Sequence, residues 1–400
     1  MDKIIIPHKL CGAVTVPPSK SQAHRAVIAA GCAAGVSAIS NLAFSEDIRA
    51  TITAMRTLGA SIRETTAAAT VRGAHPTCAD GTLIDCSESG STLRFLIPLA
   101  WLCGKTVHFT GRGRLMQRPL EPYFSVCDAA GIRYTQKADS VTFSGRLHSG
   151  AYSLPGNVSS QFITGLLFAL PQTEGDSTLT LTTPAESIGY IDLTLAVLKQ
   201  FGITVKNHDY QSFSIPGRQR FLPQSITVEG DYSQAAFYLA ANALGSHITV
   251  NGLNEASCQG DKAICDIIRR FGTPLKAQTI NVSQIPDLVP ILAVLATQAE
   301  GTTRLVGAAR LRLKESDRLL TTADMLNRLG AQVTPTDDAL IICGKTPLTG
   351  GTVDSCNDHR IAMAAAIAAT VASGAVTILG SECVAKSYAN FWEDYEGLTK

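Results

Sequence analysis

The sequence predicts an α/β protein of two domains, each built from three copies of one repeated unit. Three observations carry this prediction. Apolar, alanine-rich helices recur at nearly constant intervals, amphipathic helices that end at glycine alternate with them, and short β-branched runs lie between the helices. The length of 400 residues is also too great for one compact core.

The alanine-rich helices each begin at a polar residue that can cap a helix. They start at Ser19, Ser89, Ser159, Asp231, Asp287 and Asp358. The amphipathic helices occupy residues 45–59, 118–131, 190–202, 259–272, 314–330 and 386–397. Hairpin-like stretches follow several of the closing glycines, so the repeated unit is strand–helix–strand–helix–hairpin.

One unit is shorter than the others. The helix starts at Asp231 and Asp287 are 56 residues apart, whereas the other successive starts are separated by 70 to 72 residues. The hairpin that should follow Gly272 is reduced to residues 273–283. The sequence therefore predicts a truncated strand pair in this unit.

The unit count also predicts the domains. The first three units are contiguous and form a domain of residues 19–229. The last three span residues 230–400, but the final helix reaches the C-terminus without its hairpin. Because the opening segment has the strands that are missing there, residues 1–18 are expected to complete the domain of residues 230–400. The chain then crosses between domains near Pro18 and again near Gly230.

Composition excludes several classes of function. Hydrophobic residues make up 45% of the chain and aromatic residues 6%, the net charge is +1, and no basic run occurs, which argues against binding to nucleic acid or to a membrane surface. The eleven cysteines include no C-x-x-C pair and none at zinc-finger spacing from a histidine, as in a protein of the reducing cytoplasm. We expect a cytoplasmic monomer without a signal peptide or membrane span.

Cationic and hydroxyl side chains gather at the predicted helix starts. Lys20, Ser21 and Arg25 lie on the first turns of one helix, where unpaired backbone N–H groups and the helix dipole favour an anion. Similar groups recur at the other starts: Gly90, Arg118, Ser159, Ser160, Gln161, Lys314, Arg318, Arg360 and Lys386. These cations are too many for one phosphate, and they suit substrates that carry several anionic groups between them.

Structural alternatives apply to most of these residues. A single arginine at a helix start is usually solvated or ion-paired, and Ser159 and Ser160 could act only as caps. Asp287 precedes an apolar helix and could be its N-cap. Glu315 could be a salt-bridge partner of Lys314 or Arg318, which the spacing places one turn apart on one helix face.

Ten segments together resemble one family. In sequence and in order they are similar to the motifs of the 5-enolpyruvylshikimate-3-phosphate synthase family. The segments are SKSQAHR, ESGSTLR, QRPLEPY, VSSQF, GYIDLTL, VEGDYSQAAF, IPDL, RLKESDRL, NDHRIAMA and AKSYANFWED. The resemblance implies a two-domain inverse α/β barrel of βαβαββ units. It also implies a transferase of the shikimate pathway, in aromatic amino-acid biosynthesis. That activity moves the enolpyruvyl group of phosphoenolpyruvate onto the 5-hydroxyl of shikimate 3-phosphate and releases phosphate, with no metal or organic cofactor.

The resemblance also implies roles for individual residues. Shikimate 3-phosphate would contact Ser21 and Arg25 with its carboxylate, Ser159, Ser160 and Ser187 with its phosphate, and Lys20, Gln161, Asp287 and Lys314 with its remaining groups. Phosphoenolpyruvate would contact Lys20, Gly90, Arg118, Gln161 and Lys386 with its phosphate, and Arg318 and Arg360 with its carboxylate. Asp287 is the expected base for the 5-hydroxyl and Glu315 the expected acid for the enol methylene, with Lys20 sharing in proton transfer.

Two departures and one alternative accompany the resemblance. Glu88 and Arg310 stand where other members of the family have asparagine, which leaves the roles of these two side chains open. A UDP-N-acetylglucosamine enolpyruvyl transferase would share the fold and the donor, but it uses a cysteine in the loop that corresponds to residues 111–118, where this chain has none. Because Gly90 is retained, the resemblance also predicts sensitivity to glyphosate, with Phe95 as a departure one turn further on.

Overall fold

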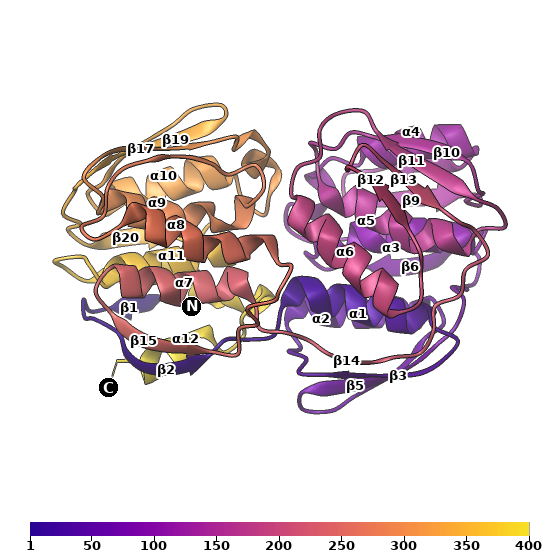
Figure 1. The fold of residues 1–400 in the computed structure, drawn as a ribbon, viewed down its shortest axis with the longest axis horizontal. Helices are drawn as coiled ribbons and strands as arrows, with labels where there is room; N and C mark the ends of the chain where they lie inside the picture. The colour runs from indigo at the N-terminus through magenta and orange to yellow at the C-terminus, as the bar shows by residue number, and fades with distance from the viewer. Residues whose placement is uncertain (400) are drawn as a thin grey trace. The chain divides into compact units, whose positions relative to one another are not determined.

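The computed structural model describes residues 1–399 and divides the chain into two compact units (Figure 1). The N-terminal unit consists of residues Pro18–Glu229, and the C-terminal unit combines Met1–Pro17 with the chain from Gly230 onward. Pro18 thus belongs to the N-terminal unit, whereas the sequence placed the first boundary after it. Each unit has its own hydrophobic core.

The N-terminal unit has three four-stranded sheets of identical pattern. In each, the first two strands are parallel and the second pairs with an antiparallel hairpin. The sheets consist of β14 (Ser225–Thr227), β3 (Gly35–Ser40), β5 (Ala68–Gly73) and β4 (Ser61–Glu64); β6 (Thr82–Asp85), β7 (Thr106–Thr110), β9 (Ser140–Ser144) and β8 (Arg133–Gln136); and β10 (Ala151–Leu154), β11 (Ser177–Leu181), β13 (Ser212–Ile215) and β12 (Lys206–His208). Strand β14, at the end of this segment, supplies the first strand of the first repeat.

Two kinds of helix accompany these sheets. The inner helices α1 (Lys20–Cys32), α3 (Gly90–Leu102) and α5 (Ser160–Ala169) are buried on almost every side, and the outer helices are α2 (Glu46–Thr57), α4 (Glu121–Ala130) and α6 (Ile188–Gln200). Short 3-10 turns occur at η1 (Leu115–Gln117) and η2 (Leu170–Gln172). Strands such as β5 and β9 alternate buried and less buried residues, so one face of each sheet looks outward. The inner helices therefore fill the interior of the unit, and the sheets and the outer helices lie around them.

The C-terminal unit repeats the pattern less completely. Its sheets consist of β16 (Thr279–Asn281), β17 (Gly301–Val306), β19 (Ala339–Gly344) and β18 (Gln332–Pro335); β1 (Lys3–Ile5), β21 (Val376–Leu379) and β20 (Gly351–Asp354); and β15 (His247–Asn251) with β2 (Cys11–Thr15). Its helices are α7 (Tyr232–Ala243), α8 (Ala263–Phe271), α9 (Val289–Thr297), α10 (Arg318–Arg328), α11 (His359–Ala369) and α12 (Phe391–Gly397), with 3-10 turns η3 (Gly260–Lys262), η4 (Pro286–Leu288), η5 (Ala309–Leu313) and η6 (Ser381–Lys386). Every residue of α9 and α11 is buried, because alanine-rich surfaces let the inner helices pack closely.

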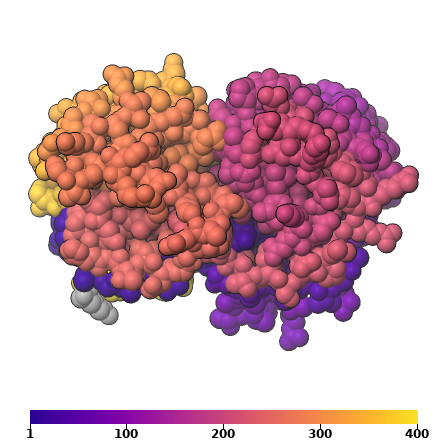
Figure 2. Space-filling view, viewed as in Figure 1, coloured from indigo at the N-terminus to yellow at the C-terminus, as the bar shows by residue number. Residues whose placement is uncertain are grey.

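The N-terminal segment contributes a strand to two of these sheets. Strand β1 pairs antiparallel with β21 and takes the place of a hairpin strand in the last repeat, whereas β2 runs parallel to β15. The indigo N-terminal residues accordingly lie within the orange and yellow C-terminal unit in Figures 1 and 2.

The shortened repeat has lost its hairpin altogether. After α8, the chain turns at Gly272 with a φ of 74°, and the one strand up to Ser283 is β16, which joins the following sheet. The sheet of β15 and β2 therefore has two strands. The predicted α/β fold class of βαβαββ units is confirmed, with six separate sheets rather than one continuous barrel.

Candidate active site

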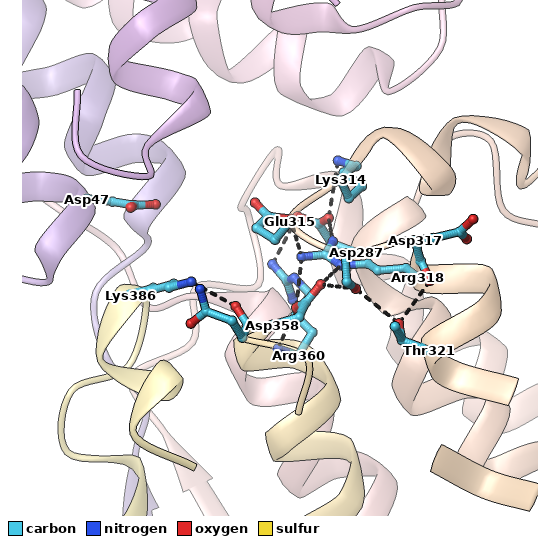
Figure 3. Close-up of polar contacts among 12 residues, drawn as sticks. Asp47, Asp287, Lys314, Glu315, Asp317, Arg318, Thr321, Asp358, Arg360 and Lys386 are labelled. Atoms are coloured by element: carbon cyan, nitrogen blue, oxygen red, sulfur yellow. Dashed lines mark hydrogen bonds and ion pairs between the residues drawn. The ribbon is translucent and has the colours of Figure 1, made fainter. Parts of the chain in front are cut away.

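Asp287 is the centre of an ion-pair cluster in the C-terminal unit (Figure 3). Its carboxylate lies 2.9 Å from Nη1 of Arg318, 2.9 Å from Nη2 of Arg360 and 3.5 Å from Nζ of Lys314. Asp287 lies in η4, whose N-cap is Ile285, and ahead of α9, whose N-cap is Leu288. The N-cap alternative for Asp287 is therefore wrong, and its carboxylate is instead paired with three cations.

Arg318 is the most enclosed cation of this cluster. Its side chain is 1% exposed, and it donates from Nε to Asp358 at 2.8 Å and from Nη2 to Glu315 at 2.7 Å. Burial opposes the charge, but Asp358, Glu315 and Asp287 together raise the pKa of Arg318 above its usual range. Arg318 is thus a fixed positive charge, and the salt-bridge contact considered for Glu315 is present.

For Asp358 the sequence predicts only a place at a helix start, with no role in the site. It is fully buried, caps α11 by accepting from the backbone N–H of Arg360 at 3.0 Å, and accepts from the Ser316 hydroxyl at 3.0 Å. The same carboxylate pairs with Arg318, so one side chain positions both arginines of the cluster. The segment NDHR contained the cap signal but no indication of the partner.

Lys314 and Arg318 do not share a helix face. Helix α10 begins at Arg318 with Asp317 as its N-cap, and Lys314 precedes it in extended backbone. Burial is the main cause that lowers the pKa of Lys314 to about 8, with Asp287 opposing the change. Lys314 can therefore exchange a proton near neutral pH.

Lys386 and Arg310 lie at 3-10 turns. Lys386 ends η6, before α12, and its Nζ donates to the carbonyl of Asn357 at 2.7 Å, beside the start of α11. Arg310 is buried in η5 and donates to the carbonyl of Ser283.

Asp261 is a further buried carboxyl group that sequence reasoning missed. It accepts a hydrogen bond from the Ser233 hydroxyl. Burial first, and then the negative charge of Asp287, raise the pKa of Asp261 to about 6. Its segment lies in the shortened repeat and shows no pattern that would have marked it.

The N-terminal unit presents a second set of predicted residues. Lys20, the first residue of α1, forms an ion pair with Asp47 of α2 at 2.8 Å. Asp47 also went unnoticed, because its helix reads as an ordinary amphipathic surface helix. Arg25 is 2% exposed and donates to Thr194 Oγ1 at 2.8 Å and to the Ser21 carbonyl at 2.7 Å.

The starts of α3 and α5 are joined by hydrogen bonds. Gln161 accepts from Arg94 at 2.8 Å and donates to Ser91 Oγ at 3.1 Å. Arg118 lies against the first residue of α3, because a Cβ added to Gly90 would come within 2.7 Å of its Nη1. Arg118 is extended rather than helical, as expected for a residue before proline, and α4 begins only at Glu121.

The three predicted serines also lie at helix starts. Ser159 caps α5 by accepting from the backbone N–H of Gln161 at 3.3 Å, and Ser160 is the buried first residue of that helix. Ser187 precedes α6 in the left-handed region, with a φ of 57°. Cations beside the backbone N–H groups of several helix starts are an arrangement that binds anionic ligands. Their contacts with substrate stay predictions.

Residues 1–399 contain no helix that is long and apolar enough to cross a membrane. The same residues contain no group of three or more His, Cys, Asp or Glu side chains placed to hold a metal ion.

Comparisons with known proteins agree on one family. The model of the EPSP synthase (3-phosphoshikimate 1-carboxyvinyltransferase) family matches residues 4–395. The 3-phosphoshikimate 1-carboxyvinyltransferases of Clostridium novyi and Clostridium acetobutylicum are 46% and 47% identical, over 98% of this chain and 96% of each relative. The EPSP synthase structure from Acinetobacter baumannii superposes with a TM-score of 0.82 at 28% identity, over 100% of this chain and 98% of that one. The chain therefore belongs to the EPSP synthase family.

Proposed function

We propose that this protein is a 3-phosphoshikimate 1-carboxyvinyltransferase, which joins the enolpyruvyl group of phosphoenolpyruvate to the 5-hydroxyl of shikimate 3-phosphate and releases phosphate. The observation that carries the proposal is the match of nearly the whole chain to relatives of that name at 46% identity. The cationic helix starts in each unit support it, since the two substrates bring two phosphates and two carboxylates.

The reaction needs one base and one acid. Asp287 takes the proton of the 5-hydroxyl as that oxygen bonds to C2 of phosphoenolpyruvate, while a proton is added to the C3 methylene. The resulting tetrahedral ketal loses a proton from its new methyl group, and its bond to the phosphate oxygen breaks. Enol ether and inorganic phosphate are the products. Arg318 is a fixed cation and holds the phosphoenolpyruvate carboxylate, whereas the oxocarbenium-like centre that precedes and follows the ketal is itself cationic and is stabilised by neighbouring anionic groups.

Glu315 is the proposed acid, and its ion pair with Arg318 bears on that role. A carboxylate that is paired at 2.7 Å with a buried guanidinium is held ionised, so it must acquire a proton before it can donate one. Binding of the phosphoenolpyruvate carboxylate to Arg318 and Arg360 would compete for the same guanidinium and make Glu315 easier to protonate. Lys20, paired with Asp47, shares in proton transfer.

The remaining substrate contacts follow the family resemblance. We propose that shikimate 3-phosphate binds Lys20, Ser21, Arg25, Ser159, Ser160, Gln161, Ser187, Asp287 and Lys314. We propose that phosphoenolpyruvate binds Lys20, Gly90, Arg118, Gln161, Arg318, Arg360 and Lys386. Residues of both units are thus assigned to binding. We also propose that residues 1–18 belong to the C-terminal domain. The pairing of β1 with β21 supports this assignment.

We also propose that the enzyme acts in the cytoplasm as a monomer, without nucleic-acid partners. Its near-neutral net charge of +1 and its eleven cysteines, which form no disulfide bond with one another within residues 1–399, support this setting.

The experiment is a phosphate-release assay with purified protein and phosphoenolpyruvate. Shikimate 3-phosphate should support turnover, whereas UDP-N-acetylglucosamine and buffer alone should not. Release of phosphate with UDP-N-acetylglucosamine would contradict the proposal. Failure to release phosphate with either acceptor would contradict it as well. Mass spectrometry of the shikimate product distinguishes enolpyruvyl transfer from simple hydrolysis of phosphoenolpyruvate.

A further inference from the structure

Helix α2 has no proposed substrate contact, yet it joins two helix starts that do. Asp47 on its first turn holds Lys20 of α1. Thr51, one turn further along, has its Oγ1 at 2.7 Å from Nδ1 of His24 in α1 and at 2.7 Å from Oγ1 of Thr92 in α3. Asp47 and Thr51 are four residues apart and therefore lie on one face of the helix.

The contacts continue to the first turn of α3. Oγ1 of Thr92 lies 2.7 Å from Oγ of Ser89, which caps α3 by accepting from the backbone N–H of Thr92 at 3.1 Å. Ser89 directly precedes Gly90. We call the chain His24–Thr51–Thr92–Ser89 the hydroxyl relay; all of its side chains have an exposed fraction of 0%.

The hydrogens of the relay can be assigned by counting donors. Each hydroxyl has one hydrogen, and that of Thr92 goes to Ser89 at 2.7 Å rather than to the Asp47 carbonyl at 3.5 Å. Thr92 then accepts from Thr51, whose only hydrogen is thereby used. His24 must consequently donate from Nδ1, which makes it the Nδ1–H tautomer.

The surroundings of His24 agree with this tautomer. Its Nε2 has no hydrogen-bond partner among residues 1–399, and its ring meets the Phe95 ring edge-on at 6.4 Å. Burial, together with the charges of Lys20 and Arg25, lowers the pKa of His24 well below its ordinary value. A neutral imidazole with a bare Nε2 is therefore the form that this environment accepts.

We infer that Thr51 and His24 are positioning residues, which hold the first turn of α3 so that Gly90 can receive the phosphate of phosphoenolpyruvate. This inference rests on the proposed function, because the assignment of that phosphate to Gly90 comes from it. Backbone N–H groups at a helix start bind an anion only when they converge on it. Loss of the relay lets that turn relax without removing any group that contacts substrate.

The test compares three variants in steady-state kinetics. Thr51→Val keeps the shape of the side chain but removes the hydroxyl, Thr51→Ser keeps the hydroxyl, and Thr53→Val makes the same change at an exposed position of α2. Thr51→Val should raise KM for phosphoenolpyruvate about ten-fold, the effect of a buried donor left unpaired, and should change KM for shikimate 3-phosphate less than about two-fold. The other two variants should behave like wild type. An unchanged KM for phosphoenolpyruvate in Thr51→Val, equal rises in both KM values, or an equal effect of Thr51→Ser would overturn the inference.

A second measurement does not depend on activity. Nitrogen NMR of protein labelled at histidine, with His24 assigned by the loss of its signals in His24→Gln, should show the Nδ1–H tautomer at pH 7. An Nε2–H tautomer would overturn the relay even if Thr51→Val fails to fold. If wild type shows the expected tautomer but no turnover with shikimate 3-phosphate, the proposed function fails and the relay geometry stands.

Discussion

Gly90→Ala tests the proposed phosphoenolpyruvate site most directly. The added methyl group would lie 2.7 Å from Nη1, 3.1 Å from Cζ and 3.2 Å from Nη2 of Arg118. An ordinary contact is about 3.5 Å or longer, so the guanidinium must move by about 0.8 Å or more. Arg118 is 8% exposed, which limits where it can go.

The size of the effect follows from the interaction that is disturbed. A hydrogen bond to a charged group contributes about 1.5–3 kcal/mol, so complete loss of the Arg118 contact would raise KM for phosphoenolpyruvate by about 10- to 150-fold. We expect the lower end, because the guanidinium is displaced rather than removed. Glyphosate extends further toward the phosphate side, so its inhibition constant should rise more than this KM, which is specificity gained by a clash.

The assay titrates glyphosate against wild type and Gly90→Ala at several phosphoenolpyruvate concentrations. Wild type should show inhibition competitive with phosphoenolpyruvate. The matched control is Gly397→Ala in α12, where an added Cβ meets nothing within 4 Å, and it should behave like wild type. Phe95 lies in α3, one turn after Gly90, and is the departure from the family resemblance in this helix. Its ring packs at 5.0 Å from the Arg25 guanidinium. Equal resistance of wild type and Gly90→Ala would refute the reasoning.

Three further predictions concern the C-terminal cluster. Asp287→Asn and Glu315→Gln should each lower kcat by about 10²- to 10⁴-fold with smaller changes in KM, measured by phosphate release; near-normal turnover would remove that residue from the mechanism. Lys314 has a pKa of about 8 and is charged below that pH, so substrate binding that needs its charge should weaken as pH rises through 8, and Lys314→Met should abolish this limb of the kcat/KM profile. Asp358→Ala leaves the buried Arg318 charge without its main partner and should lower the free energy of unfolding in urea by about 3–5 kcal/mol; a loss below 1 kcal/mol would contradict this.

The sequence by itself determined the repeat and the places where chemistry can occur. Regular intervals between apolar helices predicted βαβαββ units, because helical periodicity and turn residues are local properties of the chain. The same locality explains why the candidate residues lie at or near helix starts. Capping residues and cations in a helix start are read from a few neighbouring positions.

Local patterns failed where a boundary depends on neighbours in space. The hairpin after Gly272 was expected to be short, but it is missing from the sheet of β15 and β2. Arg118, Lys314 and Lys386 were expected to open helices, and each instead lies next to or at the end of a 3-10 turn.

Only the tertiary structure decided which side chains act together. Asp287 meets Arg318 and Arg360 across separations of 31 and 73 residues, and Thr51 meets Thr92 across 41. Arg360 lies in a different repeat from Asp287, and Thr92 in a different repeat from Thr51, whereas Arg318 lies in the same repeat as Asp287 but on its second helix. In each case the pairing depends on how the helices pack rather than on any local pattern. Asp358 shows the limit most clearly. Its capping role is visible in the segment NDHR, but its ion pair with Arg318 exists only because α10 and α11 begin side by side, and that geometry comes from packing of the buried helix faces.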